Sequence, residues 1–117
     1  MSQSSLIYHF CPRADWAAAR EAGVYTAASL ATQGFIHFSP LDHVHEAATE
    51  RARGRKDLVV LTVDEALLPR PAVWEDGDPP HPDGRQLPHV YGPVPVEAVV
   101  AVRDLRPASD GSFAPIG

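Results

Sequence analysis

Apolar and polar positions alternate along several short stretches of the chain, and this pattern predicts six short strands. Each stretch is rich in branched or aromatic residues and is bounded by Gly, Pro, Asp or Ser, as strands usually are. The predicted strands are residues 6–10, 34–38, 57–64, 72–75, 87–92 and 96–105. Residues 24–26 form a shorter candidate. Residues 58–61 are apolar on both faces, so we expect their strand to lie at the centre of a sheet.

A helical spacing of apolar residues predicts a first helix after Pro12. Residues 13–23 are rich in alanine, and Trp16 and Ala19 fall on one helical face, which we expect to pack on the core. Proline suits the first turn of a helix, and Gly23 suits the position just after its end.

A second helix is predicted from Ser39 to Gly54. The serine is a typical N-terminal capping residue and a proline follows it. Leu41, Val44 and Ala48 fall on one face, which we expect to be buried. Ser29 similarly predicts the cap of a brief helical turn that ends at Gly34.

The order of these elements indicates the fold class. The helices fall early and the strands cluster late, which favours an α+β fold with two main helices and small antiparallel-rich sheets. A chain of 117 residues fits a single domain over residues 1–117. Residues 76–86 are dense in Pro, Gly and Asp and predict an exposed loop. We expect the tail, residues 107–117, to be loosely held.

Composition and charge restrict the binding partners and the cellular compartment that we expect for this protein. The net charge of −5 argues against broad nucleic-acid binding, although four of the ten cations lie in residues 51–56. Those cations either complement a helix C-terminus or form a patch for a phosphate-bearing ligand. The lone Cys11 excludes an internal disulfide, and the chain shows no signal peptide and no membrane span. These features predict a cytoplasmic protein.

Three of the six histidines lie inside predicted strands, where a buried imidazole needs hydrogen-bond partners. His37 shares a strand face with Ser39, and His89 shares one with Tyr91. Two interpretations stay open. His9, His37 and His89 either fill the core as bonded histidines, or they line a cleft together with Ser39 and Tyr91. We expect His43 and His81 to be solvated and His45 to lie at the edge of a buried face.

The sequence gives less support to other kinds of catalytic, metal or phosphate-binding site. The strand histidines lack the spacing of metal ligands and no acid accompanies them, so we predict no metal ligands. Ser39 is not in the sharp turn of a serine nucleophile, and no glycine-rich phosphate loop occurs. Glu75 ends a short strand beside the long loop and is the candidate acid or base.

Several motifs resemble those of a known family, the domain of unknown function 952. They are "IYHF", "AGVYTAASLATQGFIHFS", "DLVVLTVD", "VWE" and "LPHVYGPVPVEAVVAV", and the match spans residues 6–103. The family more distantly resembles the ADP-ribosyltransferase-like fold, which holds NAD in a cleft between two small antiparallel sheets. That resemblance implies NAD or a related nucleotide as the ligand. It also implies that His9 contacts a ribose or diphosphate, with His37 and Ser39 at the second site position.

The combined interpretation is a histidine-lined cleft that binds a nucleotide and acts at a ribose, by ADP-ribosyl or phosphoryl transfer. The expected catalytic residues are His89, His37 and Glu75. The expected binding residues are His9, His37, Ser39 and Tyr91. The chain carries His89 where the resemblance implies an acid, and an oxocarbenium-like transition state needs a carboxylate. The alternatives are a non-catalytic binding or interaction module with structural histidines, and, less favoured, a metal-dependent hydrolase.

Overall fold

The computed structural model describes residues 5–77 and 80–116, which form an α+β fold. Its helices are α1 (Arg13–Ala22), α2 (Ala28–Gln33) and α3 (Val44–Ala52), with short 3₁₀ turns at η1 (Glu65–Leu67) and η2 (Val96–Ala98). Its strands are β1 (Leu6–Pro12), β2 (Val24–Tyr25), β3 (Ile36–His37), β4 (Leu58–Asp64), β5 (Val73–Asp76), β6 (Gln86–Val90), β7 (Val94–Pro95) and β8 (Val99–Leu105). The predicted α+β class with small antiparallel sheets is confirmed.

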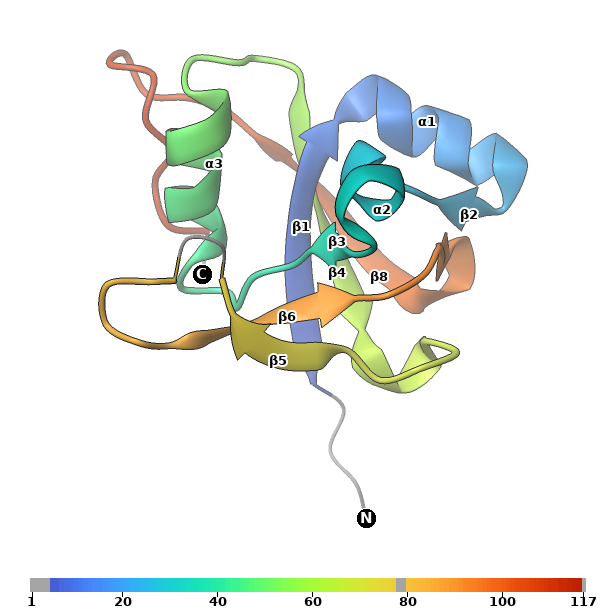
Figure 1. Ribbon diagram of the computed structural model, residues 1–117. Helices are drawn as coiled ribbons and strands as arrows, with labels where there is room; N and C mark the ends of the chain where they lie inside the picture. The colour runs from blue at the N-terminus through green and yellow to red at the C-terminus, as the bar shows by residue number, and fades with distance from the viewer. Residues whose placement is uncertain (1–4, 78–79, 117) are drawn as a thin grey trace.

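All strand pairs in the described chain are antiparallel, as predicted, but they form three sheets where two were expected. The largest sheet has the order β1-β4-β8, and β4 lies at its centre as its apolar sequence indicates. A second three-stranded sheet has the order β3-β6-β5, and β2 pairs with β7. Figure 1 shows the β5–β6 hairpin lying across the front of β1.

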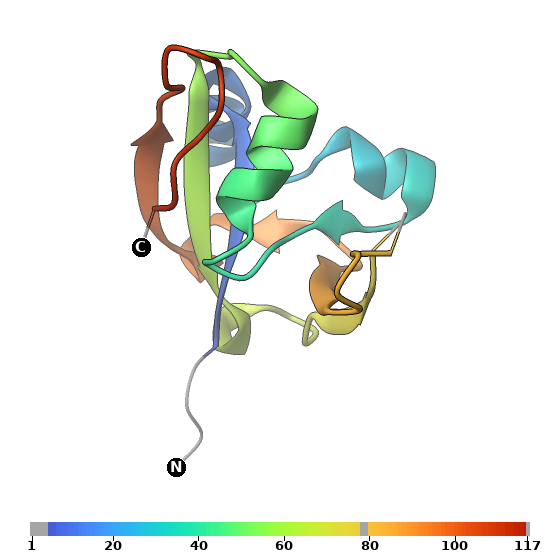
Figure 2. The ribbon, with the colours of Figure 1, turned by 90° about the vertical axis from the view of Figure 1, so that its left-hand side faces the viewer.

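Two hydrophobic clusters lie on opposite faces of β4. Val59, Leu61 and Val63 join the larger cluster, which also takes residues from β1, α1, β3 and β6. Leu58 and Val60 join the smaller one, with α3 above them. Figure 2 shows α3 packed against one side of the large sheet. Because successive side chains of a strand point to opposite faces, β4 contributes apolar residues to both clusters.

The first helix follows the sequence closely. Ala19 is buried and Trp16 packs against the larger cluster, as predicted. Gly23 follows α1 with a φ of 85°, and Gly34 follows α2 with a φ of 87°. Both values lie in the left-handed region, where glycine carries no steric penalty, so glycine ends each helix where expected.

Both predicted serine caps are wrong. Helix α2 begins at Ala28, before Ser29, and α3 begins at Val44, well after Ser39. The backbone of Ser39 exchanges two hydrogen bonds with Tyr8 of β1, at 2.8 and 2.7 Å, so the chain is still extended there. Leu41 consequently lies outside the helix and is 38% exposed.

The tail also differs from the prediction over its described part. Phe113 is 3% exposed and belongs to the cluster under α3. Its backbone N–H donates to the Thr49 hydroxyl at 2.9 Å, and the Gly54 N–H donates to the Gly111 carbonyl at 2.9 Å. The tail is held because it covers apolar surface that α3 and β4 leave open (Figure 2).

Among the described residues, none of the helices has the length and apolar character needed to cross a bilayer.

Candidate functional site

A cavity of about 680 Å³ lies between β1, the segment around β3, α3 and the loop after β5. We call it the main cavity. Three predicted binding residues, His9, His37 and Ser39, line it. Its wall also contains polar residues from α3, from the chain on either side of that helix and from the loop, which are His43, Glu46, Glu50, Arg51, Arg55 and His81.

His9 is held by both ring nitrogens. Nδ1 lies 2.6 Å from the backbone oxygen of His37, and Nε2 lies 2.7 Å from the hydroxyl of Tyr25. Because a carbonyl only accepts, Nδ1–H donates to it and Nε2 accepts from the tyrosine. Burial lowers the pKa of His9 to about 4, so the imidazole is neutral near pH 7. His9 therefore ties β1 to β3 and β2, with its ring at the cavity wall.

His37 and His89 meet across two strands. They are register partners on β3 and β6, and their ring centroids lie 5.5 Å apart. Phe35 contacts both rings, stacked on His89 at 4.2 Å and edge-on to His37 at 4.8 Å. The His37 Nε2 also lies 2.6 Å from the side-chain oxygen of Gln33. Strand pairing thus brings together two of the three predicted histidines.

His89, Glu75 and Tyr91 form a separate hydrogen-bonded group. His89 Nδ1 lies 2.8 Å from Glu75 Oε1, and the Tyr91 hydroxyl donates to the same oxygen. The hydrogen bond from Tyr91, and next that from His89, lowers the pKa of Glu75. The Nε2 atom of His89 is buried and has no hydrogen-bond partner among the described residues.

This group is not part of the wall of the main cavity as formed by the described residues. Tyr91 instead borders a smaller cavity of about 240 Å³ and is 44% exposed. The five residues predicted to line one cleft therefore fall into two neighbouring groups, and Glu75 belongs to the group of His89 and Tyr91. His37 lines the main cavity and touches Phe35 and His89, so it connects the two groups.

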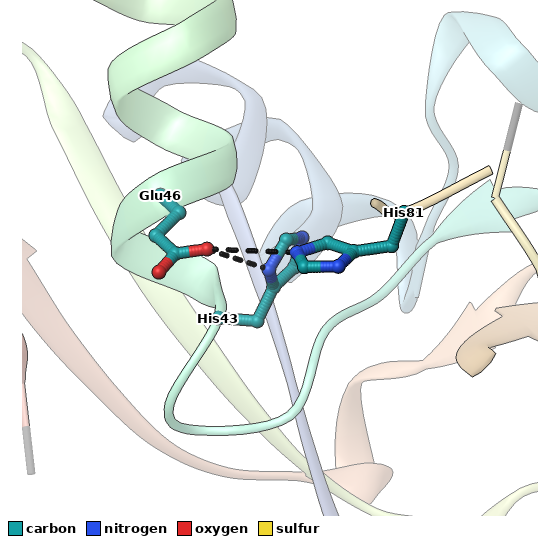
Figure 3. A group of neighbouring side chains, drawn as sticks. All are labelled: His43, Glu46 and His81. Carbon is teal, nitrogen blue, oxygen red and sulfur yellow. Dashed lines mark hydrogen bonds and ion pairs between the residues drawn. The ribbon is translucent and has the colours of Figure 1, made fainter. Parts of the chain in front are cut away.

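His43, which was expected to be solvated, is buried, and His81, which was expected to be exposed, is only partly so. His43 is 7% exposed, and the side chain of His81 is 21% exposed. His43 Nδ1 lies 3.2 Å from Glu46 Oε2, and His81 Nε2 lies 3.8 Å from the same oxygen. Figure 3 shows both rings directed at this carboxylate. Burial is the main reason that the pKa of His43 is lowered.

Part of this group of His43, Glu46 and His81 could have been predicted from the sequence. His43 and Glu46 are three residues apart, which places them on neighbouring positions of a helical turn. His81 comes from the loop after β5, and only the docking of that loop on α3 brings it near. An ion pair between Arg85 and Asp42, at 2.8 Å, helps to hold the loop there.

Comparison with known proteins supports one family. Residues 10–102 match the family described as "Protein of unknown function (DUF952)". The crystal structure of protein CC0527 from Caulobacter crescentus is similar, with a TM-score of 0.83, 33% sequence identity and 94% of each chain covered. The solution NMR structure of CC0527 has a TM-score of 0.72 and 33% identity, over 92% of this chain and 90% of that one. No curated protein matches the chain.

Proposed function

The chain belongs to the DUF952 family, described as being of unknown function, and from this premise we propose that its main cavity binds NAD or a related nucleotide. The observation that carries the proposal is a cavity of about 680 Å³ whose wall combines imidazoles, hydroxyls and guanidinium groups. Cavities that bind small ligands usually measure about 300–1,000 Å³. The wall therefore offers space and polar partners for a ribose and its phosphates.

His37 and Ser39 are the proposed contacts for the ribose. Both line the cavity, and Thr26 lies in the same wall. His9 supports them indirectly, since its Nδ1–H donates to the backbone oxygen of His37 at 2.6 Å. Its two nitrogens are used within the protein, so in this proposal His9 offers the ligand its ring surface rather than a hydrogen bond.

Arg51 and Arg55 are the proposed contacts for the phosphates. Arg51 lies in the last turn of α3, Arg55 follows that helix, and both line the cavity. A guanidinium binds phosphate oxygens well because its donors match their spacing. Arg55 also pairs with Asp57 at 2.6 Å, so Arg51 is the better candidate for the first phosphate contact.

Chemistry at the ribose is the finer part of the proposal and follows from the resemblance to the ADP-ribosyltransferase-like fold. Cleavage of the glycosidic bond of NAD builds positive charge that a carboxylate stabilises. Glu75 is the proposed carboxylate, and His89, hydrogen-bonded to it at 2.8 Å, is the proposed acid or base. Tyr91, which shares the Glu75 oxygen, would stack on a base that extends beyond the main cavity.

A second candidate is a non-catalytic binding or interaction module. One observation favours it: both nitrogens of His9 are bonded inside the protein, as in a core histidine with a structural role. Glu75 and His89 also stand apart from the wall of the main cavity. Under this alternative the ribose chemistry is absent, whereas a ligand can still occupy the cavity.

Isothermal titration with NAD, ADP-ribose and AMP tests the proposal. We expect saturable binding by the wild type and at least a tenfold weaker affinity for His37→Ala, since this variant removes a polar ring from the wall. His45→Ala is the matched control, because His45 is another histidine of the same region that does not line the cavity. Circular dichroism establishes that each variant is folded.

Release of nicotinamide from NAD separates the two candidates. Turnover that disappears in Glu75→Gln supports a ribose reaction, and binding without turnover supports the non-catalytic module. If none of the three nucleotides binds the folded wild type, the nucleotide proposal is wrong.

A further inference from the structure

We propose that His43, Glu46 and His81 form a binding site for a divalent transition-metal ion, with Zn²⁺ as the best-fitting ion. Two histidines and one carboxylate are a common ligand set for zinc. The site is distinct from the nucleotide contacts, although it lies on the wall of the same cavity.

The distances suit such an ion. The three residues offer one donor atom each, and all three atoms lie within 4.8 Å of one another. The pairs that include the Glu46 oxygen are closer, at 3.2 Å to His43 and 3.8 Å to His81. Tetrahedral zinc with bonds of about 2.0–2.1 Å holds its ligand atoms roughly 3.3 Å apart. A small movement of the exposed Glu46 side chain and of the His81 loop would close the site.

The orientation of His81 is the stronger argument. Its Nδ1 lies 2.6 Å from the carboxylate of Asp83, so Nδ1–H donates to that acid. In the neutral ring the lone pair then lies on Nε2, and Nε2 is directed at Glu46 Oε2 (Figure 3). Two acceptor atoms that face each other are brought together by a cation between them, either a proton or a metal ion. A carboxylate behind a ligating histidine is also the usual second partner in zinc sites.

The local fold positions each ligand. His43 immediately precedes α3 and Glu46 lies in its first turn, next to the buried Val44. The His81 loop is closed by a hydrogen bond from the Gly84 N–H to the His81 carbonyl, at 2.9 Å. Three protein ligands leave a coordination position for water or for an oxygen of a bound molecule, as in catalytic zinc sites.

The test uses the metal alone, on tag-free protein that has been treated with a chelator. We expect titration calorimetry to show one Zn²⁺ per chain, and Co²⁺ to give the visible absorption of a tetrahedral site. Glu46→Gln and His81→Ala should each weaken Zn²⁺ binding more than tenfold. Asp83→Asn should weaken it about 10–100-fold through the orientation of His81.

Glu50→Gln is the matched control, because Glu50 is an exposed acid one turn further along α3. It should bind Zn²⁺ as the wild type does. Glu46 has a side chain that is 54% exposed, so its replacement by glutamine is compatible with folding, which circular dichroism can verify.

Absent or non-stoichiometric binding by the wild type overturns the proposal, as does equal affinity in Glu46→Gln and Glu50→Gln. Either result would mean that a proton, and not a metal ion, bridges His81 and Glu46. Nucleotide binding plays no part in this test, so the two proposals can fail separately.

Discussion

His9 illustrates at the scale of one residue how burial determines the protonation of a histidine. Its ring donates to the His37 carbonyl and accepts from the Tyr25 hydroxyl. Both hydrogen bonds fit the neutral form, and burial lowers the pKa from 6.5 to about 4. Burial also raises the pKa of Tyr25, so its hydroxyl stays protonated and remains a donor. Near pH 7 the pair therefore consists of an uncharged imidazole and a protonated phenol.

The pH dependence of stability follows from this shift. The unfolded imidazole binds a proton as the pH falls below about 6.5, whereas the folded one does so only near pH 4. The unfolded state therefore binds more protons between these values, and the free energy of unfolding should fall on acidification by at most about 3 kcal/mol. Urea unfolding between pH 4 and pH 7 measures the slope.

Two variants isolate the contribution of His9 to that slope. His9→Gln should flatten it, because the titrating group is gone. Tyr25→Phe leaves the His9 Nε2 without its donor and should lower stability by about 1–3 kcal/mol, with the slope retained. A wild-type slope in His9→Gln would show that other groups carry the pH dependence.

The residue types of the candidate site could be predicted from the sequence, but their grouping could not. Placing His9, His37 and His89 in strands was sufficient to expect hydrogen-bonded imidazoles. The contact between His37 and His89 depends on β3 pairing with β6, which no local pattern reveals. The cluster around Glu46 was missed for a similar reason, since His81 reaches it only through the folding of a long loop.

At the scale of elements, strand β4 is the clearest link between sequence and structure. Its apolar run predicted a central strand, and six of its seven residues are buried. The start of α3 was predicted less well, because a serine followed by a proline also suits a turn after an extended segment. At Ser39 the backbone pairing with Tyr8 prevailed over the capping preference.

A matched pair of substitutions across the large sheet tests the role of β4. Leu61 and Val102 are register partners on β4 and β8, but Leu61 is 0% exposed and Val102 is 40% exposed. Leu61→Ala should lower the free energy of unfolding by about 2–5 kcal/mol, because it leaves a cavity in the larger cluster. Val102→Ala should change it by only about 0.5 kcal/mol. Chemical denaturation measures both values, and equal losses would mean that β8 is covered in solution.

The whole molecule carries a formal net charge of −5, which repels a nucleotide at long range. A phosphate-bearing ligand therefore depends on cations placed at the cavity itself. Arg51 and Arg55 provide these charges, and the acids Asp15, Glu46 and Glu50 line the same cavity. A metal ion at the cluster of His43, Glu46 and His81 would neutralise one of those acids. The two proposed sites are thus electrostatically compatible.

The proposed role of Arg51 can be tested through the salt dependence of binding. If its guanidinium contacts a phosphate, NAD affinity should fall as the salt concentration rises, because mobile ions screen the attraction. Arg51→Gln should weaken binding about 5–10-fold at low salt and flatten this dependence.

Arg103→Gln is the control: it removes the same charge, but Arg103 lies on β8 and donates to the Ile116 carbonyl at 2.8 Å. Calorimetry at several salt concentrations gives both slopes. Equal effects of the two substitutions would assign the salt dependence to net charge, and Arg51 would then have no specific contact with the phosphate.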